Sequence, residues 1–218
     1  HILRAEMPGP QKGKLVPRLQ NTALILYAIY VGLTILQILV LCATGMPFYD
    51  SCVNALATAG TGGFAVKNAS IAGYANPAAE WVIAVFMLLF GVNFNIYFFL
   101  LMRRVRDVFH NEELRIYLIL CGLSTAIITA NTLSLFENFG DALRSAFFQV
   151  TSIISTTGFA TVDFDLWPSI PKMILVMLMF IGACAGSTGG GIKVSRALLM
   201  FRSVTRELSL TLHPKMVR

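Results

Sequence analysis

A short segment occurs twice in the sequence, and it restricts the possible folds more than any other feature. Each copy is an apolar run that ends in threonine, glycine, phenylalanine and alanine, at residues 54–65 and 149–161. Aligning Gly63 with Gly158 places the copies 95 residues apart (158 − 63) and also superposes the hydrophobic segments on either side. A repeat of this kind predicts two structural units with the same architecture.

Each copy is too short to cross a membrane as a helix. Residues 47–58 would form ~18 Å of helix at ~1.5 Å per residue, whereas the hydrocarbon core is ~30 Å thick. We therefore expect a re-entrant half-helix that enters the membrane and returns. Non-helical backbone at that depth must be buried in protein or line a water-filled cavity. Glycine allows backbone carbonyls to turn inward and replace the hydration shell of a cation, so the pattern is typical of a pore loop.

The composition places the chain in a membrane. Of its 218 residues 56% are hydrophobic and only 13% are charged, and the mean hydropathy is +0.71, outside the range of soluble domains. The net charge of +6 could indicate a nucleic-acid partner, but the basic residues gather near 4–18, 103–115 and 193–218, at the ends of apolar segments. This is the positive-inside pattern of a multi-pass membrane protein. We expect lipid as a partner and no nucleic acid.

The predicted fold is an all-α membrane protein in which each unit consists of a span, a re-entrant pore helix with an extended filter, and a second span. Spans are expected at 22–43, 77–102 and 114–135, half-helices at 47–58 and 142–151, and Pro171 opens the last span. We divide the chain into a cytoplasmic lead-in (1–20), a first pore unit (21–106) and a second pore unit (107–218). Because the chain begins at His1 in polar sequence, we expect it to be part of a longer protein.

The last span is interrupted by glycines. Residues 175–181 are apolar, but residues 182–191 include three consecutive glycines, each of which disfavours helix by ~1 kcal/mol relative to alanine. We expect an irregular, mobile loop inside the membrane, beneath the two filters. A phosphate-binding loop is excluded, because Lys193 is followed by Val194 where a serine or threonine is required.

Polar residues in and beside the spans have two interpretations each. Asn93 and Asn95 lie in the second span, where amides hydrogen-bond to other helices or line a pore. Six acidic residues lie on the outer side in this topology, where they either raise the local cation concentration or are ordinary solvated loop charges. These six are Asp50, Glu80, Glu137, Asp141, Asp163 and Asp165.

Covalent catalysis has little support. An intramembrane serine hydrolase built on Ser187 would need a general base within hydrogen-bond reach, and the three histidines lie in predicted cytoplasmic or terminal segments. A secondary transporter with broken helices would also use glycine-interrupted spans, but its repeats would lack the short pore helix. We therefore predict that the chain is not an enzyme.

The motifs at 61–65 (TGGFA) and 156–160 (TTGFA), together with the break at 182–191, resemble the Trk/Ktr/HKT superfamily of potassium transporters, most closely its bacterial TrkH/TrkG type. The resemblance implies four such units around one pore, and this chain is similar to the second and third. It assigns a K⁺ selectivity filter to Thr61, Gly62, Gly63, Thr156, Thr157 and Gly158. Gly63 and Gly158 would be the filter glycines, while Thr61, Gly62, Thr156 and Thr157 would coordinate K⁺ through their backbone carbonyls. Only the internal alignment favours Gly63 over its neighbour Gly62 as the filter glycine.

The resemblance assigns a gating loop to Gly182, Gly186, Ser187, Thr188, Gly189, Gly190 and Gly191.

The resemblance also implies a function. It is gated K⁺ uptake across the bacterial inner membrane, with K⁺ as cargo and no covalent cofactor. The implied partners are a second copy of the protein in a homodimer and a cytosolic nucleotide-binding regulatory subunit. A Na⁺-permeable transporter of the same family is the alternative, and glycine rather than serine at both filter positions is the one sequence feature that bears on it.

Overall fold

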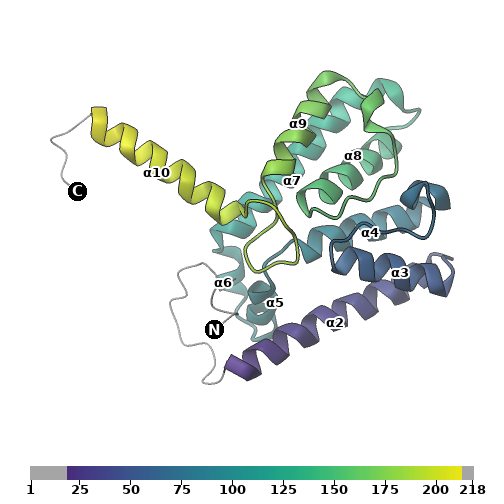
Figure 1. The fold of residues 1–218 in the computed structure, drawn as a ribbon, viewed down its shortest axis with the longest axis horizontal. Coiled ribbons are helices and arrows are strands. Elements are labelled where there is room, and N and C mark those ends of the chain that lie inside the picture. Colours follow the sequence, from purple (N-terminus) through teal and green to yellow (C-terminus); the bar gives the residue numbers. More distant parts are fainter. Residues whose placement is uncertain (1–18, 213–218) are drawn as a thin grey trace.

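The computed structural model describes residues 19–212, and it is built from helices without strands in that range (Figure 1). The prediction of an all-α membrane protein with re-entrant helices is confirmed. In chain order the elements are α2 (Leu19–Ala43), α3 (Phe48–Ala59), η1 (Ser70–Tyr74), α4 (Pro77–Phe90), α5 (Phe94–Leu101), α6 (Val105–Phe109), α7 (Glu112–Thr132), η2 (Leu133–Leu135), α8 (Phe139–Ile154), η3 (Phe164–Leu166), α9 (Ser169–Phe180) and α10 (Val194–Leu212). The predicted lead-in, residues 1–20, lies almost entirely outside the described residues.

Two helices of the described chain are long and apolar enough to cross a membrane by themselves. They are Ala23–Ala43 within α2 and Glu112–Leu135 across α7 and η2. Both match predicted spans. Their outward faces carry exposed large apolar side chains, such as Leu39 on α2 (62% exposed) and Ile119 on α7 (61%). Apolar side chains in contact with lipid are what a spanning helix requires.

The second span is not one continuous helix, which corrects the prediction for residues 77–102. α4 and α5 meet at an angle of 89° across residues 91–93. The oxygen Oδ1 of Asn93 accepts a hydrogen bond from the Asn95 amide at 2.9 Å and so caps the start of α5. Gly91 lies so close to α7 that a β-carbon there would come 2.2 Å from the Tyr117 hydroxyl. Asn93 therefore ends one helix and begins another, a role that neither sequence interpretation included.

The last span is broken, as the glycines predicted. α9 has 12 residues and begins at Ser169, two residues before Pro171. The non-helical residues 181–193 then separate it from α10, which projects away from the rest of the molecule (Figure 1). We call residues 181–193 the broken-span loop.

The two half-helices lie between the longer helices. α3 has 12 residues and packs against α2 and α4, while α8 has 16 residues and packs against α7 and α9. α8 is longer at both ends than the predicted 142–151, although it is still too short to pass as a span. α4 also packs against α8, so this helix pair joins the two repeated halves.

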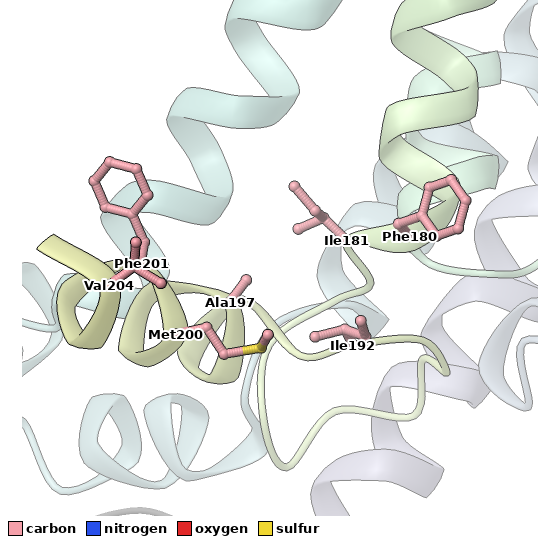
Figure 2. A pocket seen from close by; sticks show the side chains of 7 residues that line it. All are labelled: Phe180, Ile181, Ile192, Ala197, Met200, Phe201 and Val204. Atoms are coloured by element: carbon pink, nitrogen blue, oxygen red, sulfur yellow. The ribbon is translucent and has the colours of Figure 1, made fainter. Parts of the chain in front are cut away.

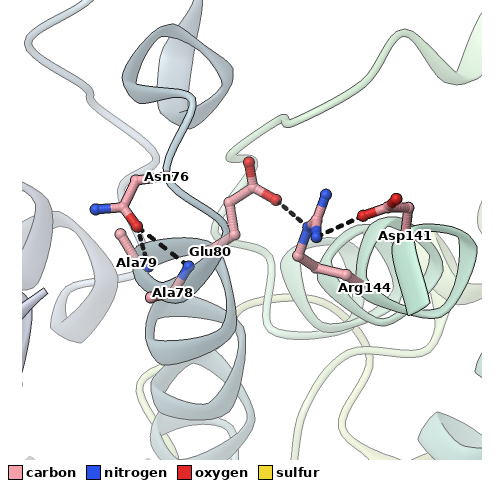
Figure 3. Close-up of polar contacts among 6 residues, drawn as sticks. All are labelled: Asn76, Ala78, Ala79, Glu80, Asp141 and Arg144. Carbon is pink, nitrogen blue, oxygen red and sulfur yellow. Dashed lines mark hydrogen bonds and ion pairs between the residues drawn. The ribbon is translucent and has the colours of Figure 1, made fainter. Parts of the chain in front are cut away.

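An ion pair at the same junction attaches α4 to α8, and a second pair lies beside it within α8 (Figure 3). Arg144 on α8 donates from Nε to Glu80 on α4 and from Nη1 to Asp141, each at 2.8 Å. The Arg144 and Glu80 side chains are only 20% and 11% exposed. Beside them Asn76 caps α4 by accepting hydrogen bonds from the amides of Ala78 and Ala79. Of the six outer acidic residues, Glu80 therefore pairs across the two halves, and Asp141 pairs with the same arginine within α8.

Candidate functional site

The two repeated motifs form loops with the same backbone conformation. We call residues 60–65 the first glycine loop and residues 155–160 the second glycine loop. In the first, the Gly62 amide donates to the Ala57 carbonyl at 2.8 Å; in the second, the Thr157 amide donates to the Ser152 carbonyl at 2.9 Å. Each bond lies 95 residues from its counterpart, and each ends its half-helix with a six-to-one hydrogen bond typical of a C-terminal cap.

Positive φ angles occur at the same two positions of both loops. The threonines have φ of 49° at Thr61 and 59° at Thr156, and the glycines have φ of 67° at Gly63 and 86° at Gly158. Glycine adopts such angles freely, but a β-branched residue does so only under strain. A strained conformation persists where the surroundings enforce it, and such residues cluster at functional sites.

The two loops face each other at close range. A β-carbon at Gly63 would lie 2.1 Å from the carbonyl oxygen of Thr157 and 3.3 Å from the carbonyl carbon of Gly158. The first loop therefore needs glycine at position 63 for space as well as for φ. The backbones of two segments 95 residues apart in sequence meet at this point.

Amide side chains of the half-helices hold the segments that follow the loops. On α3 the Asn54 amide group donates to the Tyr74 hydroxyl at 3.3 Å, and on α8 the Gln149 amide group donates to the Val162 carbonyl at 3.3 Å. Residues 54 and 149 are equivalent in the repeat. Each half-helix also directs its C-terminal, partly negative end into its own loop, which favours a cation there.

The broken-span loop contacts both glycine loops through their strained threonines. The Thr61 hydroxyl donates to the Thr188 carbonyl at 3.1 Å, and the Thr156 hydroxyl accepts from the Gly190 amide at 2.6 Å. A β-carbon at Gly189 would lie 3.0 Å from the Ser155 carbonyl oxygen. The predicted filter and gate residues are thus neighbours, and glycine is required where the backbones approach.

The same loop contacts the bend between α4 and α5. The Cys184 amide donates to the Gly91 carbonyl at 3.0 Å, and the Phe94 amide donates to the Gly186 carbonyl at 3.1 Å. The Thr188 hydroxyl donates to the Phe90 carbonyl at 3.3 Å. Backbone groups released where the helix bends therefore find partners in the broken-span loop, as a low-dielectric surrounding requires.

A narrow neck closes the broken-span loop. Ile181 and Ile192 form a short parallel bridge, in which the Gly182 amide donates to the Ile192 carbonyl at 2.8 Å. A β-carbon at Gly182 would lie 2.1 Å from the Gly190 carbonyl oxygen. Next to the neck, a pocket of about 330 Å³ opens toward α10 (Figure 2). Its lining is apolar and consists of Phe180, Ile181, Ile192, Ala197, Met200, Phe201 and Val204.

Ser187 and Lys193 both stabilise the broken-span loop internally. The Ser187 hydroxyl donates to the Cys184 carbonyl at 2.6 Å, which places it in a local turn. The Lys193 ammonium group donates to the Gly189 carbonyl. Ser187 thus has a structural hydrogen bond, and the geometry gives no support to the hydrolase alternative.

Together these elements define the class of protein. Long apolar helices, two re-entrant half-helices and carbonyl-rich glycine loops between them are the architecture of membrane proteins that move cations.

Comparison with known proteins identifies the family. The sequence model of the TrkH family, described as "Cation transport protein", matches residues 1–218, and the chain belongs to this family. The Trk system potassium uptake protein TrkH of Salmonella typhimurium (strain LT2) is 40% identical over 223 residues, which cover 99% of this chain and 46% of that protein. The protein TrkG of the same system in Escherichia coli (strain K12) is 32% identical over 98% of this chain and 45% of its own length.

A solved structure agrees with the sequence relatives. The crystal structure of the potassium transporter TrkH from Vibrio parahaemolyticus is similar with a TM-score of 0.84 at 32% identity, over 94% of this chain and 45% of that one. The resemblance inferred from the motifs is therefore confirmed. The chain spans less than half the length of these relatives. Because the family consists of transport proteins, the prediction that the chain is not an enzyme is also confirmed.

Proposed function

We propose that the complete protein takes up K⁺ across the bacterial inner membrane, and that this chain contributes two of the loops that line its pore. The observation that carries the proposal is the pair of glycine loops, which share one backbone conformation and meet at Gly63 and Thr157. Repeated carbonyl-bearing loops around one axis are how K⁺-selective pores replace the ion's hydration shell. The relatives that are named potassium uptake proteins add support from sequence.

The filter in this proposal consists of residues 61–63 and 156–158. Backbone carbonyls of Thr61, Gly62, Thr156 and Thr157 would coordinate K⁺. Of the two adjacent glycines in the first loop, it is Gly63 that has a positive φ, as Gly158 does in the second. This equivalence supports Gly63 and Gly158 as the filter glycines and supports the division into units 21–106 and 107–218.

The gate in this proposal is the broken-span loop. Its residues Thr188 and Gly190 hydrogen-bond to Thr61 and Thr156, directly beside the proposed filter. An irregular loop at this place obstructs the path while it is bound and clears it when it moves. Gly182, Gly186, Ser187, Gly189 and Gly191 supply the tight neck, turns and close approaches that this position needs.

Partners form a further part of the proposal. We expect the complete protein to form a homodimer and to bind a cytosolic nucleotide-binding regulatory subunit, as the family resemblance implies. The mass of the purified complex in detergent, with and without co-expressed regulator, tests both expectations. A strictly monomeric protein that retains no cytosolic subunit would contradict them.

Rubidium uptake into liposomes that contain the complete protein tests the function. We expect excess K⁺ to block uptake and excess Na⁺ or Li⁺ to leave it largely unchanged. Equal block by Na⁺ would instead favour the Na⁺-permeable alternative. Deleting residues 182–191 should raise uptake if the loop is the gate. If neither the native protein nor the deletion variant takes up rubidium, the proposed function is wrong.

A further inference from the structure

A single carboxylate on α7 binds both the broken-span loop and the start of α10. The oxygen Oε1 of Glu113 accepts a hydrogen bond from the Ala185 amide at 2.6 Å and another from the Ser195 amide at 3.2 Å. Ala185 lies in the loop and Ser195 lies in the first turn of α10. A glutamate in the first turn of a helix is an ordinary sequence feature, so no sequence pattern distinguishes Glu113.

The surroundings of Glu113 make these bonds strong. The side chain is half-buried, and its oxygen lies at the starts of both α7 and α10, where helix dipoles favour negative charge. Hydrogen bonds to a charged acceptor in a partly desolvated site are stronger than neutral ones. The Ala185 amide would lose this partner if the loop moved away from α7, and the Ser195 amide would lose it if α10 moved.

The neighbouring glutamate has a different role. Glu112 is exposed and pairs with Arg202, further along α10. This pair connects α7 to α10 but makes no contact with the loop itself among the interactions of the described residues. Glu112 is therefore a natural control for Glu113, because the two residues share the charge, the helix and the adjacent position.

We propose that Glu113 is the latch that keeps the broken-span loop closed and that couples the loop to α10. A movement of α10 carries the Ser195 amide away from Glu113. The Glu113 carboxylate then reorients or becomes hydrated, and its hydrogen bond to the Ala185 amide is lost. This role of Glu113 rests on the proposed function, in which the broken-span loop is the gate. It makes Glu113 a positioning residue that has no contact with the transported ion.

A native thiol inside the loop reports the latch without any measurement of transport. Cys184 lies next to Ala185 and is 0% exposed, while Cys121 on α7 is 3% exposed in the packed core. Loop release exposes Cys184 alone, whereas loss of α7 packing exposes both thiols. N-ethylmaleimide labelling of the complete protein, followed by peptide mass spectrometry, gives both rates from one sample.

The test uses Glu113→Ala and Glu113→Gln, with Glu112→Gln as the control. We expect Glu113→Ala to speed Cys184 labelling about tenfold, as for the loss of one hydrogen bond to a charged group. Glu113→Gln keeps an acceptor oxygen without the charge, so its labelling rate should be intermediate. Cys121 labelling should stay unchanged in every variant, and Glu112→Gln should leave Cys184 at the native rate.

Two results would overturn the latch. One is a native Cys184 rate in both Glu113 variants, and the other is a parallel rise at Cys121, which would mean that α7 itself had loosened. Rubidium uptake by the same samples separates the latch from the proposed function. Faster Cys184 labelling with higher uptake supports both, whereas faster labelling with unchanged uptake supports the latch and contradicts the gate.

Discussion

The two glycine loops have the same backbone but very different surroundings. Phe64 of the first loop is 79% exposed, whereas its counterpart Phe159 in the second is 1% exposed. Phe159 is buried in a cluster drawn mainly from α2, α3 and α4, that is, from the other half of the repeat. The second loop is thus seated against the first unit, and nothing in the described chain takes the same place beside Phe64.

The surroundings of Gly63 and Gly158 also differ between the two loops. A β-carbon at Gly63 would collide with the second loop, but one at Gly158 would have nothing within 4 Å. The first loop thus contacts the following unit through Gly63, and the second loop packs Phe159 on the preceding unit; repetition of this contact would give a head-to-tail ring. We therefore expect further units of the complete protein to cover the faces at Phe64 and Gly158, which are uncovered here.

The second loop is also stabilised by hydrogen bonds from hydroxyl groups that the first loop lacks. The Ser152 hydroxyl donates to the Phe159 carbonyl at 2.6 Å, and the Ser155 and Thr157 hydroxyls bond to each other at 2.7 Å. The equivalent residues of the first loop, at positions 57, 60 and 62, are alanine and glycine. Two similar backbone conformations are therefore stabilised by different hydrogen bonds.

The largest effect is expected from glycine substitutions. Gly63→Ala places a β-carbon against the Thr157 carbonyl and adds backbone strain of about 1–3 kcal/mol, so we expect rubidium uptake by the complete protein to be lost. In the 218-residue chain, thermal unfolding in detergent should show a smaller loss for Gly158→Ala, which adds strain without a collision. Native uptake in the Gly63→Ala protein would contradict the contact between the loops.

Truncation of the two phenylalanines tests the asymmetry of burial. In the 218-residue chain Phe159→Ala should lower the free energy of unfolding by about 3–5 kcal/mol. Phe64→Ala should change it by about 0.5 kcal/mol or less, because the side chain is exposed. Thermal unfolding in detergent measures both. In the complete protein a preceding unit should bury Phe64, and the cost of Phe64→Ala should then rise; an unchanged cost there would break the ring interpretation.

Removing the Ser152 hydroxyl from the second loop, or adding one at the equivalent position of the first, tests the contribution of its hydrogen bond to Phe159. Ser152→Ala leaves the buried Phe159 carbonyl without its donor, which should cost about 1–3 kcal/mol. The reverse exchange, Ala57→Ser in the first loop, is the matched control and should not destabilise the protein. Melting temperatures of the two variants give the comparison. Equal melting temperatures would mean that the hydroxyl contributes nothing to the second loop.

A salt-dependent effect is expected at the ion pair between the halves. Arg144 bonds to Glu80 and Asp141, whereas the equivalent residue of the first half is Tyr49. Arg144→Met leaves the Glu80 carboxylate, whose side chain is only 11% exposed, without its partner, so we expect a cost of about 1–3 kcal/mol. The difference in melting temperature from the native protein should shrink in high salt. A difference that is independent of salt would assign the effect to packing.

Local features explain why so much of the fold was predictable. Apolar length defines the spans at 22–43 and 114–135, and the two short segments before the glycines could only be half-helices in a membrane. The consecutive glycines at 189–191 break the last span for the same local reason. The internal repeat then placed Thr61, Gly63, Thr156 and Gly158 at equivalent positions, and their φ angles agree with that equivalence.

Other features depend on residues far apart in the sequence. Residues 91–93 look like part of a continuous apolar span, but the helix bends there because the broken-span loop, some 90 residues later, supplies partners for the freed backbone groups. Glu113 is similar, since its two partners lie 72 and 82 residues away. No local sequence pattern predicts contacts between residues so far apart.

The membrane environment, the repeated unit and the family could be predicted from the sequence, because hydrophobic length, glycine content and motif spacing are short-range features of the chain. The packing of one loop on the other, the bend in the second span and the contacts that hold the broken-span loop became visible only in the folded molecule. Those outcomes follow from hydrogen bonds and close backbone approaches between distant segments. Inside a membrane such contacts must satisfy nearly every backbone polar group, so their partners are set by the whole fold.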